Sequence, residues 1–437
     1  MYNTFKQHIE TSFPFLKDAR LLIAVSGGID SMVLTHLCHQ IKLDIALAHC
    51  NFNLRDEESD ADEQFVLNYG QKIDKEVFTQ HFNTKEYAKK HKLSIQMAAR
   101  ELRYEWFNDL STALAFDYIL TAHHADDNLE TFIINLSRGT GLDGLTGIPS
   151  ENDKIVRPLL AFSRQDILDY ASEHKIEWRE DRSNEEVKYL RNKIRHELVP
   201  VLKELHPQFL SNFLNSQKYL QGSSKILDQH IEEIKTRIFK KEGRVYKVSI
   251  ADLLDLEPLP PYLHEFFKGF GFTQWDDIKD LLTAQSGKQL FSDSHRMLKD
   301  RGYLLIDEYK GKISHKEIYE ITEENLSMIT PLKLTFKEVN AISKEDESVI
   351  FVDKETLKFP LIVRKWEIGD YFYPYGLKGK KKLSKFFKDE KYSLIAKENQ
   401  WLLCSGDDIM WVIRKRVDDR FKVTEKTNQI LKIQIDQ

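Results

Sequence analysis

The segment Ser-Gly-Gly-Ile-Asp-Ser at residues 26–31 directly follows an apolar run and carries residue types that suit a phosphate group. Adjacent glycines let main-chain amides approach a ligand without a Cβ in the way, and a serine hydroxyl at each end adds a donor. A helix that begins at this turn would direct the positive end of its dipole toward the same point. We therefore predict a phosphate cradle, assigned to ATP, that is formed by Ser26, Gly27, Gly28, Ile29, Asp30 and Ser31.

This cradle lacks the lysine of the GxxxxGK[ST] loop, which would contact a γ-phosphate. The difference favours a loop that holds a diphosphate as it leaves ATP. Asp30 is a candidate ligand for a Mg²⁺ ion that neutralises the departing charge. A plain strand–turn–helix corner is the competing interpretation, and it leaves the serines and the aspartate without a role. A second glycine-rich segment, residues 139–144, matches GxGxxG but follows an expected helix, which argues against dinucleotide binding.

Polar side chains are concentrated in residues 121–131, which read Thr-Ala-His-His-Ala-Asp-Asp-Asn-Leu-Glu-Thr. Three interpretations are open: a polar shelf that holds nucleotide and Mg²⁺, helix capping by one aspartate, and a phosphohydrolase metal cage. We favour the shelf, because capping alone does not explain the paired histidines. On this interpretation His123 contacts ATP, Asp126 and Asp127 bind the metal, and Asp127 also takes part in catalysis.

Three groups of basic residues could contact a polyanion. Arg100 and Arg103 lie three residues apart, so they share one face of an expected helix and could steady a phosphate or a developing negative charge. Arg191 and Arg195 are one helical turn apart and could form a wall for RNA. Lysines in residues 377–391 alternate with aromatic residues, which suits RNA backbone contact and base stacking. For each group a solvated surface is the alternative. The lysines selected for RNA binding are Lys380, Lys381, Lys382 and Lys385.

The elements that must position these residues alternate between strand-like and helix-like segments through the first 200 residues. Such alternation predicts a parallel sheet with helices on both faces, in which ligands bind at the carboxyl ends of the strands. This rule selects the turns after Val25, Cys50 and Ala122, and it adds His49 to the residues assigned to ATP. The expected strands are residues 20–25, 43–50, 76–82 and 116–123, and the expected helices are residues 31–40, 57–70, 84–115 and 128–137.

The chain length of 437 residues predicts about three domains. We place a catalytic α/β domain at 1–215, a helical or mixed middle domain with a linker at 216–350, and a small α+β domain at 351–437. The net charge of −5 restricts any RNA site to local basic patches. Three cysteines without a CxxC pair, a polar N-terminus and the lack of an apolar run of about 20 residues predict a cytoplasmic protein that does not associate with membranes.

Residues 26–31, with the apolar strand before them, resemble the PP-loop of the N-type ATP pyrophosphatases, which cleave ATP between the α- and β-phosphates. Further segments, in the same order, resemble the tRNA(Ile)-lysidine synthase family. They are TAHHADDNLET (121–131), SRGTGLDGLTGI (137–148), RPLLAFSRQDI (157–167), DRSN (181–184), RNKIRHELVP (191–200), VRKWEIGDYFYPYG (363–376) and KKKLSKFF (380–387). The resemblance implies a Rossmann-like PP-loop sheet, followed by a mixed middle domain and a C-terminal domain that binds tRNA.

The same resemblance implies the chemistry. ATP would adenylate the C2 oxygen of the wobble cytidine in tRNA(Ile) with a CAU anticodon, and L-lysine would then displace AMP. The lysidine formed would change decoding from AUG to AUA. ATP and Mg²⁺ are the implied cofactors, tRNA(Ile) and L-lysine the implied partners, and a homodimer is the family-level expectation. Catalytic roles are implied for Asp30, Arg100, Arg103, Asp127 and Arg191, and tRNA-binding roles for Arg191, Arg195, Lys380, Lys381, Lys382 and Lys385.

One segment departs from the family pattern. Residues 49–55 read His-Cys-Asn-Phe-Asn-Leu-Arg, whereas the family usually has His-Val-Asn-His-Gly-Leu-Arg. Phe52 therefore excludes a catalytic histidine at its position, and adenine recognition there is left to main-chain groups and apolar packing. The competing function is sulfur transfer to a tRNA base on the same PP-loop fold, which generally needs a persulfide cysteine or a cluster of cysteines. The spacing of Cys38 and Cys50 argues against it.

Overall fold

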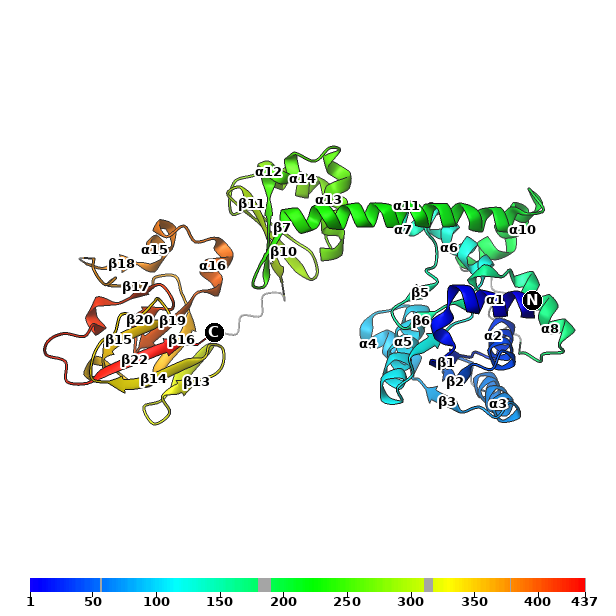
Figure 1. Ribbon diagram of the computed structural model, residues 1–437, viewed down its shortest axis with the longest axis horizontal. Helices are drawn as coiled ribbons and strands as arrows, with labels where there is room; N and C mark the ends of the chain where they lie inside the picture. The colour runs from blue at the N-terminus through cyan, green and yellow to red at the C-terminus, as the bar shows by residue number, and fades with distance from the viewer. Residues whose placement is uncertain (56, 180–189, 310–316, 378, 437) are drawn as a thin grey trace. The chain divides into compact units, whose positions relative to one another are not determined.

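A six-stranded sheet forms the centre of the N-terminal half of the chain (Figure 1). The computed structural model describes residues 1–437 except 56, 180–189, 310–316, 378 and 437, and it divides into two units, Met1–Gln229 and His230–Gln437. The strand order in the sheet is β3-β2-β1-β4-β6-β5, and every neighbouring pair is parallel except β5 with β6. The strands are β1 (Arg20–Ala24), β2 (Asp44–Asn51), β3 (Val77–His81), β4 (Tyr118–Leu120), β5 (Glu151–Asn152) and β6 (Ile155–Val156).

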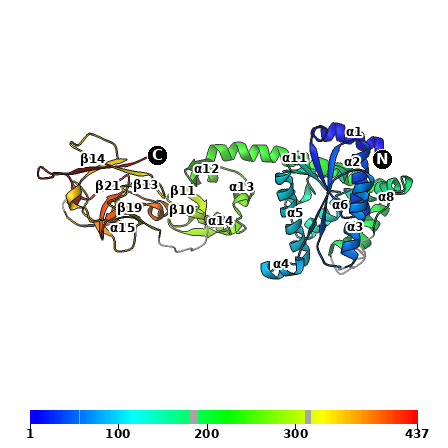
Figure 2. The same ribbon diagram turned by 90° about the horizontal axis from the view of Figure 1, so that it is seen from below.

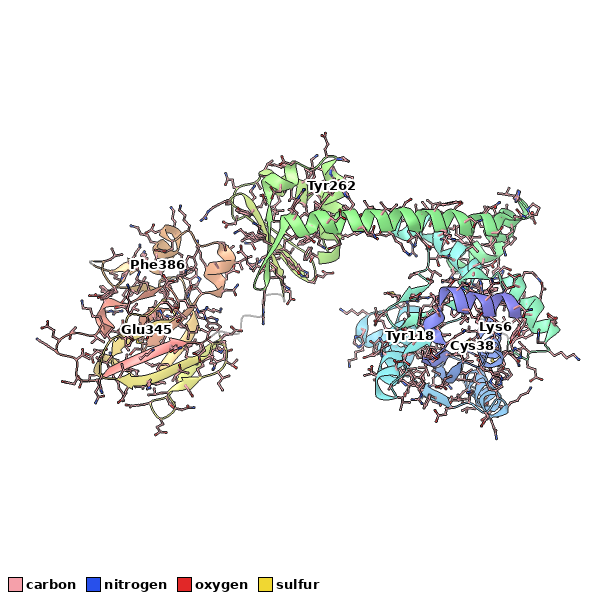
Figure 3. The ribbon with its side chains drawn as sticks, viewed as in Figure 1. Lys6, Cys38, Tyr118, Tyr262, Glu345 and Phe386 are labelled. Atoms are coloured by element: carbon pink, nitrogen blue, oxygen red, sulfur yellow. The ribbon has the colours of Figure 1, made fainter. Side chains whose placement is uncertain are left out.

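Helices cover both faces of this sheet, as the alternating sequence pattern predicts (Figure 2). On one face, α1, α2 and α8 contribute buried residues such as Phe5, Met32 and Tyr170; Cys38, labelled in Figure 3, lies in the same core. On the other face, α5 places Phe107 against Leu22 of β1. The helices are α1 (Tyr2–Ser12), α2 (Ile29–Gln40), α3 (Glu57–Lys72), α4 (Thr84–His91), α5 (Ile95–Ala113), α6 (Ala125–Ser137), α7 (Leu142–Leu145), α8 (Arg164–Glu173), α9 (Leu190–Lys193), α10 (Val199–Glu204) and α11 (Phe209–Ile238).

Two of the expected helices differ from the structure by more than two residues. The single helix expected at 84–115 is divided into α4 and α5, because Lys92 adopts a left-handed conformation with φ of +56° and Ser94 starts a new helix by accepting a hydrogen bond from the Met97 amide. The helix expected at 128–137 begins earlier, at Ala125. The glycines at 139–144 follow α6, so this segment does not have the strand-to-helix context of a dinucleotide fingerprint.

The second unit begins within the long helix α11, which ends at Ile238. An antiparallel sheet follows, with strand order β7-β8-β11-β10-β9 and a core shared with the C-terminal end of α11 and with three further helices. The strands are β7 (Phe239–Glu242), β8 (Val245–Ser249), β9 (Gln289–Phe291), β10 (His295–Asp300) and β11 (Tyr303–Glu308), and the helices are α12 (Ile250–Leu254), α13 (Leu259–Phe267) and α14 (Trp275–Thr283).

The C-terminal part contains two antiparallel sheets around one apolar core. Their orders are β12-β16-β19-β20-β21 and β13-β14-β22-β15, and a separate pair joins β17 to β18. The stretch we expected to be a linker supplies β12, β13 and β14, whose Ile321, Met328 and Leu334 are buried in this core. The elements are β12 (Ile318–Ile321), β13 (Ser327–Met328), β14 (Leu334–Val339), β15 (Val349–Asp353), β16 (Leu361–Lys365), β17 (Tyr371–Phe372), β18 (Lys381–Lys382), α15 (Leu383–Asp389), α16 (Leu394–Asn399), β19 (Trp401–Ser405), β20 (Asp408–Val412), β21 (Arg416–Val417) and β22 (Ile430–Ile435).

Throughout the described residues, no helix is both long enough and apolar enough to cross a lipid bilayer.

Candidate active site

The turn between β1 and α2 has the form that the sequence predicts for a phosphate cradle. The Ser31 hydroxyl donates to the Gly28 carbonyl at 2.8 Å and accepts from the Ser26 amide at 3.2 Å, so the two serines fix the loop from within. Gly27 has a φ of +87°, which a residue with a side chain adopts only with strain. Because α2 begins at Ile29, its first amides face the loop and provide donors for an anion.

His49 supports this loop from β2. Its side chain is buried, and its Nδ1–H donates to the carbonyl of Val25 at 2.9 Å, at the point where the chain leaves β1. Burial lowers the pKa of His49, so the ring is neutral at physiological pH. The structure thus brings His49 to the edge of the cradle; its assignment to ATP stays a prediction.

Asp30 faces the cradle from the first turn of α2. Its Oδ1 atom is buried and accepts no hydrogen bond from any residue that the structure describes. The Oδ2 atom lies 3.4 Å from Arg164, and Oδ1 lies 3.8 Å from Nε2 of His124. Burial raises the pKa of Asp30 against the opposing influence of His124 and Arg164. A bound cation or a further hydrogen-bond donor would stabilise the charged form of this carboxylate.

The segment after β4 caps helix α6, but the cap is a histidine and not the aspartate that the capping interpretation names. The Nδ1 of His124 accepts from the Asp127 amide at 3.4 Å, and Asp127 Oδ2 accepts from the His124 amide at 3.1 Å. His124 also lies 3.8 Å from Asp30, and the role of this segment as a shelf for nucleotide and Mg²⁺ stays a prediction. Burial lowers the pKa of the neighbouring His123 to about 4, and the Thr121 hydroxyl lies 3.0 Å from its Nδ1.

Two arginines predicted to bind tRNA converge on the acidic side chains of α6. Arg191 lies in α9 and Arg195 in the π-helical turn Ile194–Leu198. Their Nε atoms donate to the two carboxylate oxygens of buried Glu130, at 2.8 Å and 2.6 Å respectively, and both reach Oδ1 of Asp127 at 3.1–3.2 Å. Burial alone would raise the pKa of Asp127, but His124 and Arg191 outweigh it and the pKa is lowered.

Asp126 and Asp127, which the sequence assigns to a metal, are both engaged by groups of the chain itself. Asp126 accepts from the Arg164 amide at 2.8 Å and forms an ion pair with Lys203, while Asp127 meets the two arginines. The sequence indicates no role for Lys203 or Arg164. RPLLAFSRQDI contains Arg164, but nothing in its spacing indicates a contact with Asp126.

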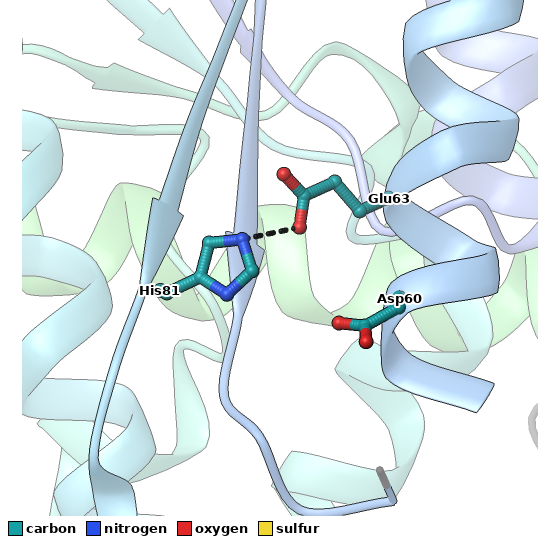
Figure 4. A group of neighbouring side chains, drawn as sticks. All are labelled: Asp60, Glu63 and His81. Atoms are coloured by element: carbon teal, nitrogen blue, oxygen red, sulfur yellow. Dashed lines mark ion pairs between the residues drawn. The ribbon is translucent and has the colours of Figure 1, made fainter. Parts of the chain in front are cut away.

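Among the described residues, the group whose ligand atoms lie close enough for a metal is another one: Asp60, Glu63 and His81 (Figure 4). Glu63 and His81 form an ion pair at 2.8 Å, and the Asn51 amide donates to both Asp60 and Glu63. These contacts already satisfy the group, and Asp60 and His81 are exposed. We assign it no metal.

The arginines of α5 each lie over an aromatic ring. The guanidinium of Arg100 is 4.9 Å from the ring centre of Tyr104, and that of Arg103 is 5.2 Å from the ring centre of Phe52. Both arginine side chains are exposed. Their roles in catalysis stay predictions.

The C-terminal lysines lie on β18, on α15 and in the turn before them. Lys380, Lys382 and Lys385 are exposed, whereas Lys381 forms an ion pair with Asp389 at 2.8 Å. The aromatic residues that interrupt the run, Phe386 and Phe387, are buried in a core and are not available for base stacking. Lys378 and the DRSN segment at 181–184 lie outside the described residues.

Comparison with known proteins gives matches along nearly the whole chain. The PP-loop domain family matches residues 1–202, the TilS substrate binding domain matches 241–309, and the TilS substrate C-terminal domain matches 361–435. A tRNA(Ile)-lysidine synthase of Parabacteroides distasonis is 37% identical over 437 residues, covering 99% of each chain. The proteins of that name from Bacteroides thetaiotaomicron and Porphyromonas gingivalis are 39% identical, over 97% of each chain, and 34% identical, over 93% of this chain and 92% of the relative.

Proposed function

The chain belongs to the tRNA(Ile)-lysidine synthase family, and from that premise we propose that it attaches L-lysine to C2 of the wobble cytidine in tRNA(Ile) with a CAU anticodon. The reaction is a carbon–nitrogen ligation in two steps. ATP first adenylates the C2 oxygen and releases diphosphate. The lysine amine then attacks C2 and expels AMP, giving lysidine, and the codon read changes from AUG to AUA.

The observation that carries this proposal is the loop between β1 and α2. Its serines bond each other and the loop main chain, so the first amides of α2 are left to donate to a ligand. Preorganised amides of this kind stabilise negative charge that develops on a leaving group, without reorganisation during the reaction. The loop would hold the diphosphate, and His49 would keep the end of β1 in place.

Mg²⁺ is implied by the chemistry, and the residues fit it at one position. Asp30 offers a buried carboxylate oxygen without a hydrogen-bond donor among the described residues, whereas Asp126 and Asp127 are already bonded to cations of the chain. We therefore propose Asp30 as the ligand. When bound, the ion would offset charge on the departing diphosphate.

The remaining residues would orient the substrates. His124 directs its Nε2 toward Asp30 and Asp127, while its Nδ1 serves as the helix cap, which fixes the ring. We propose that Arg100 steadies the adenylate, and that Arg191 and Arg195 form the wall beside the reacting base. A homodimer and a cytoplasmic location remain family-level proposals.

Sulfur transfer to a tRNA base is the alternative function, and the cysteines give it no support. Cys38 and Cys404 are buried, and burial raises the pKa of Cys50 to about 12 and that of Cys404 to about 11. Since the thiolate is the reactive form, none of the three cysteines suits persulfide chemistry at neutral pH.

One assay tests the proposed function. The protein is incubated with ATP, Mg²⁺, radiolabelled L-lysine and a tRNA(Ile) transcript bearing CAU. Label should enter the tRNA in step with release of AMP and diphosphate, and a transcript with a GAU anticodon should take up none. Transfer of label from a sulfur donor instead, or lysine uptake without ATP, would overturn the proposal.

A further inference from the structure

Two aromatic rings stack on each other at the carboxyl ends of β2 and β3. Phe52 follows β2 and Phe82 follows β3; their ring centres are 5.6 Å apart and their planes are inclined by only 21°. Trp106 of α5 meets Phe82 edge-on, at 6.3 Å. Phe52 and Phe82 are both partly exposed.

Three hydrogen bonds hold the main chain of Phe52 and Phe82 in place. The Phe82 amide donates to the Asn51 carbonyl at 2.8 Å, and the Thr84 hydroxyl donates to the Phe52 carbonyl at 2.9 Å. The side chain of Asn53, which itself has a φ of +49°, donates to the Phe82 carbonyl at 3.3 Å. The rings are thus fixed before any ligand arrives, which lowers the entropic cost of binding to them.

Arg103 adds a cation to this pair of rings. Its guanidinium lies 5.2 Å from the ring centre of Phe52, and its side chain is exposed. No hydrogen bond or ion pair joins Arg103 to a carboxylate in the part of the chain that the structure describes. The two stacked rings and this exposed guanidinium form one group, which we call the Phe82–Phe52–Arg103 platform.

We propose that the Phe82–Phe52–Arg103 platform binds an unpaired base of the tRNA anticodon loop by stacking on the Arg103 guanidinium. Arginine planes and aromatic rings are the groups on which proteins stack splayed RNA bases, and the positive charge suits a base carried on a phosphate backbone. The platform lies at the same edge of the sheet as the loop at 26–31, but after β2 and β3 and not after β1. This inference rests on the proposed function, because it requires tRNA as the substrate.

The platform depends on two residues at which this chain departs from the family pattern, Phe52 and Asn53. The family usually has His-Gly where this chain has Phe52 and Asn53. The Phe52 ring stacks on the Phe82 ring and also lies next to the Arg103 guanidinium, and the Asn53 side chain donates a hydrogen bond to the main chain of Phe82. Both departures from the family pattern therefore contribute to the same structure.

The test uses Arg103→Lys, which keeps the charge and removes the plane, and Phe52→Leu, which removes the ring and keeps an apolar side chain. Each should raise the Kd for tRNA(Ile) by roughly tenfold, as expected for the loss of one stacked base, with an unchanged salt dependence. For Phe52→Leu, the kcat at saturating tRNA should stay within about twofold of the wild-type value. The double variant should bind little worse than either single variant, because both changes disrupt one stack.

Arg20→Lys is the matched control, because Arg20 lies over Phe116 at 4.7 Å but at the start of β1, the opposite edge of the sheet. Its Kd for tRNA should equal that of the wild type. Unchanged tRNA binding by Arg103→Lys would overturn the inference, as would an effect of Phe52→Leu that is confined to kcat. Direct tRNA binding is measured separately from lysine transfer, so failure of the platform and failure of the proposed function give different results.

Discussion

The Asp30 side chain has a buried carboxylate oxygen that accepts no hydrogen bond from the described residues. Asp30 also lies in the first turn of α2, next to the phosphate cradle. A carboxylate that served only to cap the helix would accept hydrogen bonds from the helix amides. The unsatisfied oxygen costs stability when nothing is bound, because a buried polar atom has lost its water. This cost supports the proposal that Asp30 binds a cation.

We expect Asp30→Asn to lower kcat by on the order of 100-fold or more, since it removes the charge that would hold a cation beside the diphosphate. The Kd for tRNA should change by less than about twofold. Steady-state release of diphosphate and filter binding of tRNA measure the two quantities. Asp169→Asn, an exposed change on α8, is the control and should leave both unchanged. Full activity of Asp30→Asn would contradict the assignment.

The lowered pKa of His123 should make the free energy of unfolding depend on pH. Its pKa of about 4 in the folded chain is below the unfolded value of about 6.5, because burial disfavours the charged ring. Between these values the unfolded state binds more protons, so the stability falls as the pH is lowered from about 6.5 to about 4, by on the order of 2 kcal/mol. Urea unfolding of the wild type and of His123→Gln at several pH values measures this change. An equal pH dependence in both proteins would contradict it.

At the element scale, the rule that ligands bind at the carboxyl ends of parallel strands correctly grouped distant residues. It placed Asp30, His49 and His123 at one edge of the sheet, because the parallel strands β1, β2 and β4 all end at that edge. The contacts of Asp126, in α6, with α8 and α10 were not predictable. Nothing in the sequence indicates that Arg164 and Lys203 meet Asp126, since those pairs are 38 and 77 residues apart.

The role of the aromatic residues in the C-terminal lysine run could not be predicted from the sequence either. Phe386 and Phe387 interrupt a run of lysines, and on composition they fit base stacking. In the structure they are the buried face of the short helix α15, with the lysines on its exposed face. A seven-residue helix offers too little periodicity to distinguish an aromatic platform from a small core.

Glu130 links α6 to α9 and to the π-helical turn, so its loss should loosen both attachments. Glu130→Gln leaves Arg191 and Arg195 without their buried partner; we expect a loss of about 2 kcal/mol, less than for fully buried pairs because the arginines are partly exposed. The melting temperature of the first unit should fall by about 4–8 °C in a thermal scan.

Glu197→Gln is the control for this prediction. Glu197 pairs with Lys193 at 3.9 Å, and both side chains are more than half exposed, so the melting temperature should change by less than about 2 °C. Equal shifts for the two variants would show that the buried position of Glu130 does not matter.

At the scale of the whole molecule, the net charge of −5 makes local basic patches responsible for RNA binding. Replacement of Lys380, Lys382 and Lys385 by glutamine should weaken tRNA binding and reduce the slope of log Kd against log salt concentration by about 2. The kcat at saturating tRNA should not change. Substitution of the same three lysines by arginine keeps the charge and should keep the slope. An unaltered slope in the glutamine variant would remove these lysines from the RNA-binding surface.

The three cysteines have a practical consequence for measuring the distance between the two units. Cys38 and Cys404 are buried, and burial raises the pKa of Cys50 far above neutrality. Maleimide dyes react with thiolates, so the three native cysteines should react with them only slowly. One cysteine introduced on an exposed site of each unit would then accept a donor and an acceptor fluorophore with little background. Energy transfer between the two dyes, with and without tRNA, would report directly on their separation.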